Sequence, residues 1–431
     1  SGSGRISQRG LSGSLPTILR TGAQGENADM EELRARHLHL TTQKEALDVL
    51  KGLEADPYGI QAMLPKMIHM NIILEGLECR VANIIKQEML SLGGDAAVAR
   101  GAVACSIART DVILMGTLKQ LQRFVEKVAA QPFGLSRISD RIRLILKNLL
   151  LESLAVRTSR RNLQLGERTL IMGILNVTPD SFSDGGSFAS SEMAVEEGIR
   201  MVEGGADILD IGGESTRPGS DSVDVEEELK RVIPVIRELA GRIDIPLSID
   251  TMKAAVAREA LAEGAEIVND VSSMDFDNSM AKVVADARAA LILMHMRGKP
   301  KEMQQGDLTY RSLRGEIIAF LQKRIEKAEE IGIDPEQIMV DPGLGFGKTA
   351  LDNMRLIRYL GEFKVLGRPI VTGASRKSFI GTVTGGTPRE RIEGTAAAVT
   401  AAIMNGSRVI RVHDVKTMKK VAAMADALIK A

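Results

Sequence analysis

The sequence contains no tryptophan, and aromatic residues make up only 3% of its 431 positions. Domains that bind single-stranded nucleic acid stack bases on aromatic side chains, so this composition disfavours that class. The 56 basic and 56 acidic residues cancel. The chain therefore lacks the overall positive charge that attracts nucleic acids and anionic membranes, and we expect neither as a partner.

Long apolar runs and cysteines are also scarce. No stretch reaches the roughly 18 consecutive apolar residues of a transmembrane helix, so none is predicted. The two cysteines, Cys79 and Cys105, are too few for a disulfide framework, and no Cys/His cluster has the spacing of a structural zinc site. Buried, reduced thiols in a cytoplasmic protein are the simplest interpretation.

The rest of the composition, 44% hydrophobic and 26% charged residues, is typical of a globular protein, and the length favours two or three domains. Residues 1–25 contain three Arg and no acidic residue, as transit peptides do, but the chain starts with Ser and has no apolar h-region. We expect residues 1–29 to be a flexible tail or a cloning remnant.

Residues 30–152 are predicted to form a small α/β layer domain, large enough for its own core. We predict strands there at 36–40, 67–74, 101–106 and 112–116, and helices at 42–54, 78–92, 117–130 and 136–152. Residues 153–169 have a weak apolar pattern and are expected to be a linker. No motif in residues 1–160 predicts a chemical role for this domain.

From Leu170 onward, short apolar runs alternate with amphipathic segments, which is typical of a parallel sheet covered by helices. Eight such units in about 260 residues match the size of a (β/α)8 TIM barrel over 170–431. A doubly wound open sheet is the alternative, but it seldom needs eight units. The predicted strands are 170–176, 207–213, 245–250, 265–270, 290–295, 337–342, 368–373 and 408–413, with helices in the gaps such as 191–204, 224–242, 311–331 and 414–430.

A polar residue follows or ends every one of these predicted strands. They are Asn176, Glu214 to Arg217, Asp250, Asn269 with Asp270, His295, Asp341, Lys377, and Arg411 with His413. A single Asp or Asn could simply cap the next helix, but capping alone does not explain all eight. Because the carboxyl ends of TIM-barrel strands converge on one mouth, we infer that this mouth is a functional site.

The loops after the first two predicted strands are dense in hydroxyls, carboxylates and turn-forming residues. They read NVTPDSFSDGG (176–186) and GGESTRPG (212–219), and such loops can close over a ligand. Arg217 precedes Pro218 on a restricted backbone and can bind a carboxylate or a phosphate. Arg411 and His413 share one side of the last strand, and near Asn176 they predict an anion site.

The segment DPGLGFGK (341–348), followed by Thr349, ends like a P-loop. The first glycine of that motif would fall on Pro342, so ATP binding is not predicted. What remains is a carboxylate at a strand end, followed by a glycine-rich loop that can approach a ligand closely.

Seven motifs together resemble dihydropteroate synthase: GILNVTPDSFSDGG, DIGGESTRPGS, SIDT, NDVS, DPGLGFGK, SRKS and RVHDV, in this order over roughly residues 165–431. That family joins 6-hydroxymethyl-7,8-dihydropterin diphosphate to 4-aminobenzoate and releases pyrophosphate in folate biosynthesis. The resemblance implies a TIM barrel, transferase activity, a Mg²⁺ cofactor and a homodimer. It also implies a dissociative mechanism, in which pyrophosphate departs before the amine attacks.

The resemblance further implies three groups of binding residues. It places Asp250, Asn269, Asp341 and Lys377 around the pterin ring, and Asn176, Arg411 and His413 at the pyrophosphate, with Asn176 also at the metal. It places Asp180, Ser183, Thr216, Arg217, Pro218, Phe346 and Ser378 in the 4-aminobenzoate pocket. Asp250, Asp341, Lys377, Arg411 and His413 are the implied catalytic residues.

Two other functions are weighed against this one. A pterin-binding methyltetrahydrofolate:corrinoid methyltransferase shares the strand-end Asp and Asn residues, but it needs no pyrophosphate site. A non-enzymatic binding module would be expected to lose some of the motif residues, and none is missing. Pyrophosphate release from the two substrates distinguishes these possibilities.

Overall fold

The computed structural model describes residues 34–431, apart from 152, 179–186, 215–221, 299–302 and 304–305. The described part of the chain divides into two compact units, with the boundary between Ile68 and His69. The first contains helices α1 (Gln43–Gly52) and α2 (Pro57–Met67), and a capping box between Thr42 and Glu45 starts α1. The predicted strand at 36–40 is wrong. Its residues are mostly exposed, so their alternating pattern has no apolar face to bury.

A three-stranded antiparallel sheet with the order β1-β3-β2 begins the second unit. Its elements are β1 (His69–Glu78), α3 (Cys79–Ser91), β2 (Asp95–Val98), the 3-10 turn η1 (Arg100–Ala102), β3 (Arg109–Thr117), α4 (Leu118–Val128) and α5 (Leu135–Leu149). The helices lie close to their predicted positions. The predicted strand at 101–106 is wrong, because η1 and the left-handed backbone of Cys105 (φ 47°) bend the chain there.

The remaining strands form an eight-stranded parallel sheet with the order β11-β10-β9-β8-β7-β6-β13-β12. A bridge between Val340 and Ile370 joins the two ends of this order, so the sheet closes into a TIM barrel and the open-sheet alternative is excluded. The strands are β6 (Leu170–Asn176), β7 (Ile208–Gly212), β8 (Leu247–Asp250), β9 (Ile267–Asp270), β10 (Ala290–Met294), β11 (Ile338–Asp341), β12 (Val371–Thr372) and β13 (Val409–Val412). All eight predicted strands are confirmed.

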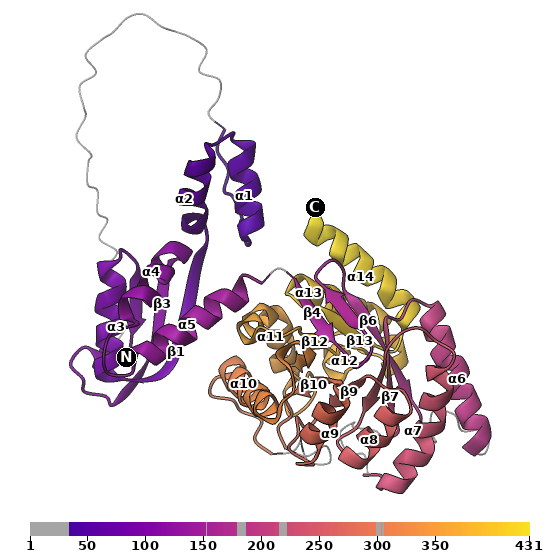
Figure 1. Ribbon diagram of the computed structural model, residues 1–431. Coiled ribbons are helices and arrows are strands. Elements are labelled where there is room, and N and C mark those ends of the chain that lie inside the picture. The colour runs from indigo at the N-terminus through magenta and orange to yellow at the C-terminus, as the bar shows by residue number, and fades with distance from the viewer. Residues whose placement is uncertain (1–33, 152, 179–186, 215–221, 299–302, 304–305) are drawn as a thin grey trace, which may run out of the picture. The chain divides into compact units, whose positions relative to one another are not determined.

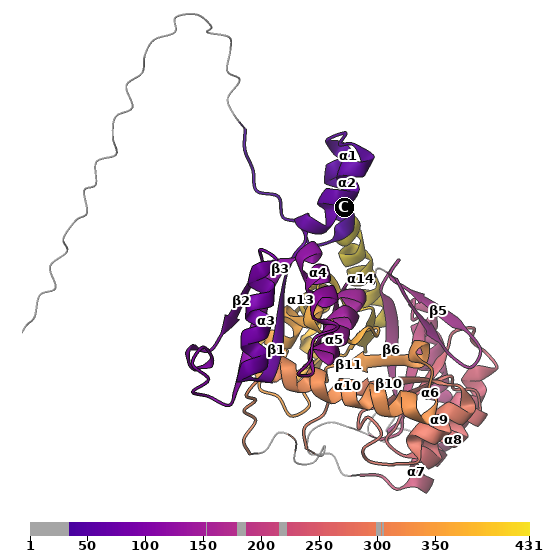
Figure 2. The same ribbon diagram turned by 60° about the vertical axis from the view of Figure 1, so that its left-hand side comes forward.

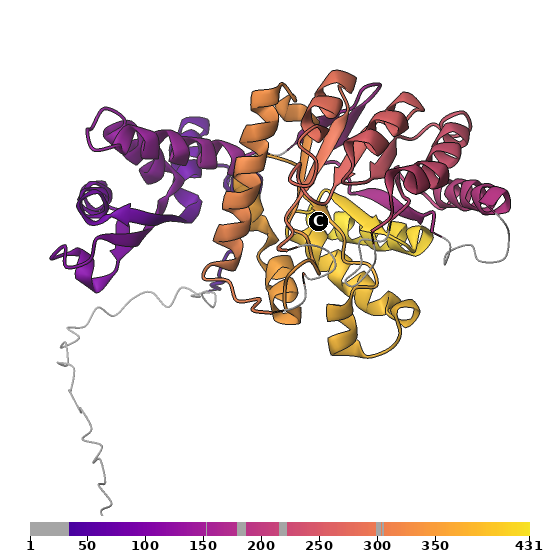
Figure 3. The ribbon, with the colours of Figure 1, turned by 90° about the horizontal axis from the view of Figure 1, so that it is seen from below.

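Helices surround this barrel, as Figures 1 and 3 show. They are α6 (Ser187–Glu203), α7 (Val225–Ala240), α8 (Ala254–Ala262), α9 (Met280–Ala287), α10 (Leu313–Ile331), α11 (Ala350–Arg358), α12 (Ser378–Thr384), α13 (Ile392–Met404) and α14 (Val415–Lys430), with 3-10 turns η3 (Pro335–Gln337), η4 (Leu360–Leu366) and η5 (Pro388–Glu390). Their apolar faces pack on the outward side chains of the strands in one continuous core. Within the described residues, no helix is long and apolar enough to cross a membrane.

The segment expected to be a plain linker contains an antiparallel hairpin, β4 (Leu154–Arg157) and β5 (Asn162–Leu165) (Figure 2). Val156 and Leu165 on this hairpin are buried in a cluster with Leu170, Ile208 and other residues from the amino ends of the barrel strands. The hairpin therefore closes the barrel at the end opposite the carboxyl ends of its strands.

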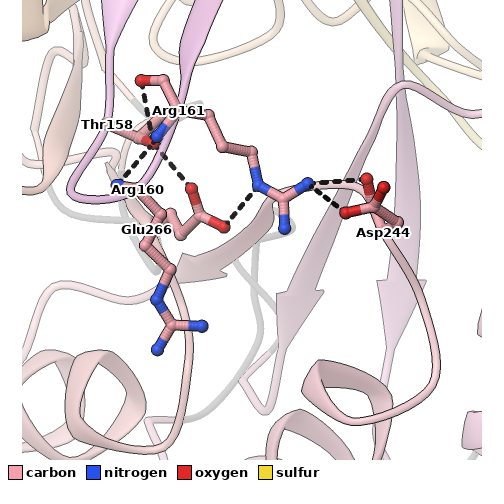
Figure 4. Close-up of polar contacts among 5 residues, drawn as sticks. All are labelled: Thr158, Arg160, Arg161, Asp244 and Glu266. Atoms are coloured by element: carbon pink, nitrogen blue, oxygen red, sulfur yellow. Dashed lines mark hydrogen bonds and ion pairs between the residues drawn. The ribbon is translucent and has the colours of Figure 1, made fainter.

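A buried carboxylate fixes the hairpin to the barrel (Figure 4). Glu266, only 1% exposed, accepts hydrogen bonds from the Thr158 hydroxyl at 2.6 Å and from the Arg161 Nε at 2.8 Å. Arg161 also reaches Asp244, whose carboxylate lies 3.0 Å from its guanidinium. These contacts satisfy a charge that burial would otherwise make costly.

We predict that Arg161→Ala lowers the free energy of unfolding by about 3 kcal/mol, because it leaves the Glu266 carboxylate buried without its cation. Arg157→Ala is the matched control on the same hairpin. Its side chain is 48% exposed and pairs with Asp334 at the surface, so its loss should stay below about 1 kcal/mol. Urea unfolding followed by circular dichroism compares the two variants, and equal losses would contradict the account.

Candidate active site

The strand register brings several predicted site residues into one row. Asn176 pairs with Gly212, Gly212 with Asp250, and Asp250 with Asn269, across β6, β7, β8 and β9. A Cβ atom on Gly212 would lie 3.5 Å from the Asp250 Cβ and 3.9 Å from the Asn176 Oδ1. The glycine in this row therefore leaves room between two polar side chains at the carboxyl ends of the strands.

Arg411 lies on β13, the strand that pairs with β6, and its side chain connects members of this cluster. Its Nε donates to Asp210 Oδ2 and its terminal NH2 to Asp250 Oδ2, both at 2.6 Å. Asn269 Nδ2 donates to the same Asp210 oxygen at 3.1 Å. Two of the three guanidinium nitrogens of Arg411 are thus engaged within the barrel. Asp210 is fully buried on β7, and sequence reasoning missed it, although an acid inside an otherwise apolar strand run was the available signal.

Burial controls the charge of this cluster. It raises the pKa of Asp250 to about 7, since the neighbouring Asp210 and Glu228 add to the effect and Arg411 only partly opposes it. Burial opposes the charge of Arg411, but Asp210 and Asp250 outweigh it and raise the pKa of the guanidinium. Among the described atoms, Asp250 Oδ1 and Asp210 Oδ1 are buried and have no hydrogen-bond partner. Such atoms are acceptors for a ligand that carries N–H groups.

Asp341 and Lys377 form a second pair of opposite charges at the mouth. Burial raises the pKa of Asp341, which accepts the Gly343 N–H at 2.7 Å. Burial lowers the pKa of Lys377 to about 8, although Asp341 partly opposes this shift. The Lys377 Nζ donates to the Leu344 carbonyl and lies 4.7 Å from the centre of the Phe346 ring. The predicted pterin residue Lys377 and the predicted 4-aminobenzoate residue Phe346 are therefore neighbours.

The glycine-rich loop after β11 is held from inside by Lys348. Its Nζ contacts the carbonyls of Gly343 (2.8 Å), Phe346 (2.9 Å) and His295 (3.2 Å), and the His295 Nδ1 at 3.0 Å. Burial lowers the pKa of Lys348 to about 7 and that of His295 to about 3. His295, which the sequence places among the chemical strand-end residues, is thus a neutral partner of this lysine.

The glycines of this loop are required by the space around them. Gly343 and Gly347 have φ values of 71° and 66°, and a Cβ atom would lie 1.9 Å from the His295 carbonyl oxygen and 2.6 Å from that of Arg297, respectively. The segment that resembles a P-loop ending is therefore a tightly folded wall of the mouth, and Lys348 is its internal support. Sequence analysis quoted Lys348 but gave it no role.

A second buried lysine, also missed, supports the end of β7. Lys253 Nζ contacts Glu228 Oε2 at 2.5 Å and also bonds Glu214, the residue just after the Gly212-Gly213 pair. Burial opposes the charge of Lys253, but the hydrogen bonds that it donates to the two carboxylates outweigh this effect and raise its pKa. This triad joins the ends of β7 and β8 to α7, next to Asp250.

The other predicted residues are placed as follows. His413 is half-buried, and its Nδ1 lies 3.1 Å from the Ser375 hydroxyl. Ser378 is exposed at the start of α12, beside Lys377. Asp270, by contrast, uses its carboxylate to bond Ser272 and Met274 and so shapes its own loop. Asp180, Ser183, Thr216, Arg217 and Pro218 lie outside the described residues.

Asn176 was predicted to contact a metal ion. It is half-buried at the mouth, and its amide oxygen is a ligand of the type that Mg²⁺ accepts. In the part of the chain that the structure describes, no three His, Cys, Asp or Glu side chains gather as a metal site. A Mg²⁺ ion here would depend mainly on oxygens of a bound substrate, as is common for this ion.

The sequence also matches a known protein family over the region that forms this site. The model of the family described as pterin binding enzyme matches residues 172–413, which is just over half of the chain. The chain belongs to this family. The matched region begins in β6 and ends at His413, so it includes the whole mouth described above.

Two curated relatives differ in how much of the chain they cover. A dihydropteroate synthase from Synechocystis is 50% identical over 265 residues, covering 61% of this chain and 91% of its own. A probable bifunctional folylpolyglutamate synthase/dihydropteroate synthase from Halobacterium salinarum is 41% identical over 374 residues, covering 86% of this chain but only 44% of its own. The match to the Halobacterium protein is longer than the barrel at 170–431, so this match also includes residues that precede the barrel.

The fold is shared with solved structures of the same group. The dihydropteroate synthase of Xanthomonas albilineans with 4-aminobenzoic acid is 44% identical, with a TM-score of 0.60, and the match covers 65% of this chain and 99% of that one. The barrel is therefore a complete member of this fold, and the rest of the chain is additional to it.

We predict that Lys348→Met lowers the free energy of unfolding by about 3 kcal/mol, because three buried carbonyls lose their donor. Lys377→Met is the control, since it removes a lysine from the same mouth. It should cost less than about 1 kcal/mol, because Asp341 can take up a proton when the cation is gone. Chemical denaturation measures both, and a larger loss for Lys377→Met would show that the support has been assigned to the wrong lysine.

Proposed function

We propose that this chain is a transferase that condenses 6-hydroxymethyl-7,8-dihydropterin diphosphate with 4-aminobenzoate, giving 7,8-dihydropteroate and pyrophosphate. The observation that carries the proposal is the set of polar side chains at the carboxyl end of the barrel, in a chain that belongs to the pterin binding enzymes. Relatives and a solved structure at 41–50% identity bear the name dihydropteroate synthase.

The pterin ring would lie among Asp250, Asn269, Asp341 and Lys377. One edge of a pterin presents two neighbouring N–H donors, which suit a carboxylate that accepts both hydrogen bonds. Asp341 is buried at a strand end and suits this role. The unpartnered Oδ1 of Asp250 is a second acceptor facing the same cluster.

The diphosphate would lie at Asn176, Arg411 and His413, on the strands β6 and β13 that pair with each other. The C–O bond to pyrophosphate breaks first, and both electrons leave with the oxygen. Cationic and polar partners favour this departure because they stabilise the negative charge that develops on the leaving group. Arg411 already bonds Asp210 and Asp250. Its positive charge would therefore lie between the leaving pyrophosphate and the residues that bind the ring.

The cation left behind is delocalised into the pterin ring, and the carboxylates of Asp250 and Asp341 favour it electrostatically. The amine of 4-aminobenzoate then forms the C–N bond, and its proton passes to solvent. An aniline nitrogen needs no general base to be nucleophilic, so this step depends mainly on positioning.

Mg²⁺, when bound, would neutralise charge on the diphosphate. We propose that Asn176 is its protein ligand, because its amide oxygen lies in the row that continues to Asp250. The chain's own part in the departure of pyrophosphate is to hold the diphosphate beside Asn176 and His413.

The second substrate would lie beside the Phe346 ring and Ser378, near Lys377. The remaining residues proposed for this pocket are Asp180, Ser183, Thr216, Arg217 and Pro218. Sulfonamides imitate 4-aminobenzoate in shape and charge, so they should compete for this pocket.

Three further properties belong to the proposal. We propose that the chain acts in the cytoplasm, where a small-molecule biosynthetic enzyme meets its substrates. We propose that it forms a homodimer, as the family resemblance implies. We also propose that it binds neither nucleic acid nor membrane, in keeping with its zero formal charge.

The direct test is pyrophosphate release by the full-length chain supplied with both substrates. Sustained release should require 4-aminobenzoate, which captures the cation, and Asp341→Asn should lower kcat/KM at least roughly a hundredfold by weakening the ring site. Asp334→Asn, a change of a partly exposed carboxylate that starts η3, is the control and should leave the rate unchanged. A folded chain that releases no pyrophosphate, but methylates a corrinoid, would establish the alternative function.

The ring site should also respond to pH. Asp250 accepts hydrogen bonds best when ionised, and its pKa is raised to about 7. Affinity for 6-hydroxymethylpterin should therefore fall as the pH drops below 7, by up to about tenfold per pH unit. Calorimetry at pH 5 to 7 measures this, with Asp250→Asn as the control that binds weakly and with a smaller pH dependence, because burial also raises the pKa of Asp341. A flat profile in the unaltered chain would remove Asp250 from the ring site.

A further inference from the structure

The chain's only two cysteines meet in space although 26 positions separate them. The sulfur atoms of Cys79 and Cys105 lie 2.7 Å apart, which is about 0.7 Å longer than a disulfide bond. Cys79 is the first residue of α3, and Cys105 lies in the turn that follows η1. Both belong to the part of the chain that precedes the barrel, for which the proposed function gives no role.

The two thiols differ in accessibility. Cys79 is 4% exposed, whereas Cys105 is exposed, so the expectation that both thiols are buried is wrong for Cys105. Cys105 has a left-handed backbone (φ 47°), which is uncommon for L-residues, and its sulfur contacts that of Cys79 at the start of α3. An accessible thiol therefore lies directly against a protected one.

Asn83 contacts the same group. Its Nδ2 donates to the Ala102 carbonyl at 2.8 Å and lies 3.6 Å from the Cys105 Sγ and 3.9 Å from the Cys79 Sγ. The Cys79 thiol also donates to the Ala102 carbonyl, at 2.7 Å. The amide is thus positioned one helical turn after Cys79, where it can stabilise negative charge on either sulfur.

We propose that Cys79 and Cys105 form a dithiol/disulfide redox site whose oxidant is a low-molecular-weight disulfide such as oxidised glutathione. The exposed Cys105 thiolate attacks one glutathione sulfur, a mixed disulfide forms, and one glutathione thiolate leaves. Cys79 then loses its proton and attacks the Cys105 sulfur, and the second glutathione leaves as a thiolate. The two cysteine protons reappear on two glutathione thiols, so one disulfide is reduced for each one formed.

The disulfide would fasten the turn at 100–106 to the start of α3 and close a loop that contains β2. Asn83 is a positioning residue in this scheme, because it touches both sulfurs but is not itself oxidised. The site lies outside the barrel mouth, and its test is independent of the proposed transferase activity.

The test uses the full-length chain in buffers of fixed total glutathione and increasing oxidised fraction. After an acid quench and alkylation with N-ethylmaleimide, intact mass should shift from two alkylated thiols to none, and peptide mapping should find Cys79 linked to Cys105. Cys79→Ala should instead accumulate glutathione on Cys105, and Cys105→Ser should leave Cys79 largely unreacted. Two free thiols throughout the series, or a stable glutathione adduct on the unaltered chain, would overturn the proposal.

Asn83→Leu tests the positioning role. It should slow release of the second glutathione roughly tenfold, as expected for the loss of a hydrogen bond to a charged sulfur, while the reduced chain stays folded by circular dichroism. Asn83→Gln, which keeps the amide, should restore part of the rate. An unchanged rate in Asn83→Leu would show that the two sulfurs exchange without help from the amide.

Discussion

The mouth of the barrel depends on one buried ion cluster, in which Arg411 bridges the carboxylates of Asp210 and Asp250 at 2.6 Å each. Inside a low-dielectric barrel, removing any one of these charged groups would leave another one buried without a partner, at a large cost in stability. The bridge fixes the ends of β7, β8 and β13 relative to each other, and Asn269 on β9 joins it through Asp210. The ring-binding groups are therefore held in place before any ligand arrives, which is the condition for electrostatic catalysis.

The two ends of the barrel use buried charge for different purposes. At the amino end, Glu266 bonds Arg161 and Thr158, and the contact holds the β4–β5 hairpin over the barrel core. At the carboxyl end, Asp250 and Asp341 keep raised pKa values because burial is not fully compensated. The charges at the amino end thus contribute to stability. At the carboxyl end, the buried carboxylates lack full compensation, and a bound ligand with hydrogen-bond donors or positive charge can supply it.

Much of this architecture could be predicted from the sequence, because fully buried parallel strands are continuous apolar runs and their polar ends stand out. The strand positions of Asn176, Asp250, Asn269 and Asp341 follow from that pattern. The partners of each side chain do not, since they depend on the register across strands. Asp210 stands out in the sequence as an acid inside an apolar run, but only the structure shows that it bonds Arg411 and Asn269. Short elements were also missed, because the hairpin at 154–165 and β2 are too brief to show a clear period, and the segment 101–106 is apolar without being a strand.

A crystal structure of the chain with 6-hydroxymethylpterin and pyrophosphate tests the central claim most directly. The account predicts that the ring lies against Asp250, Asn269, Asp341 and Lys377, with its donor edge on a carboxylate, and that pyrophosphate lies by Asn176 and His413. It also predicts that the Arg411 bridge stays intact, because the site is formed in advance. A ring bound away from Asp250 and Asp341, or a bridge that breaks when ligand binds, would contradict it.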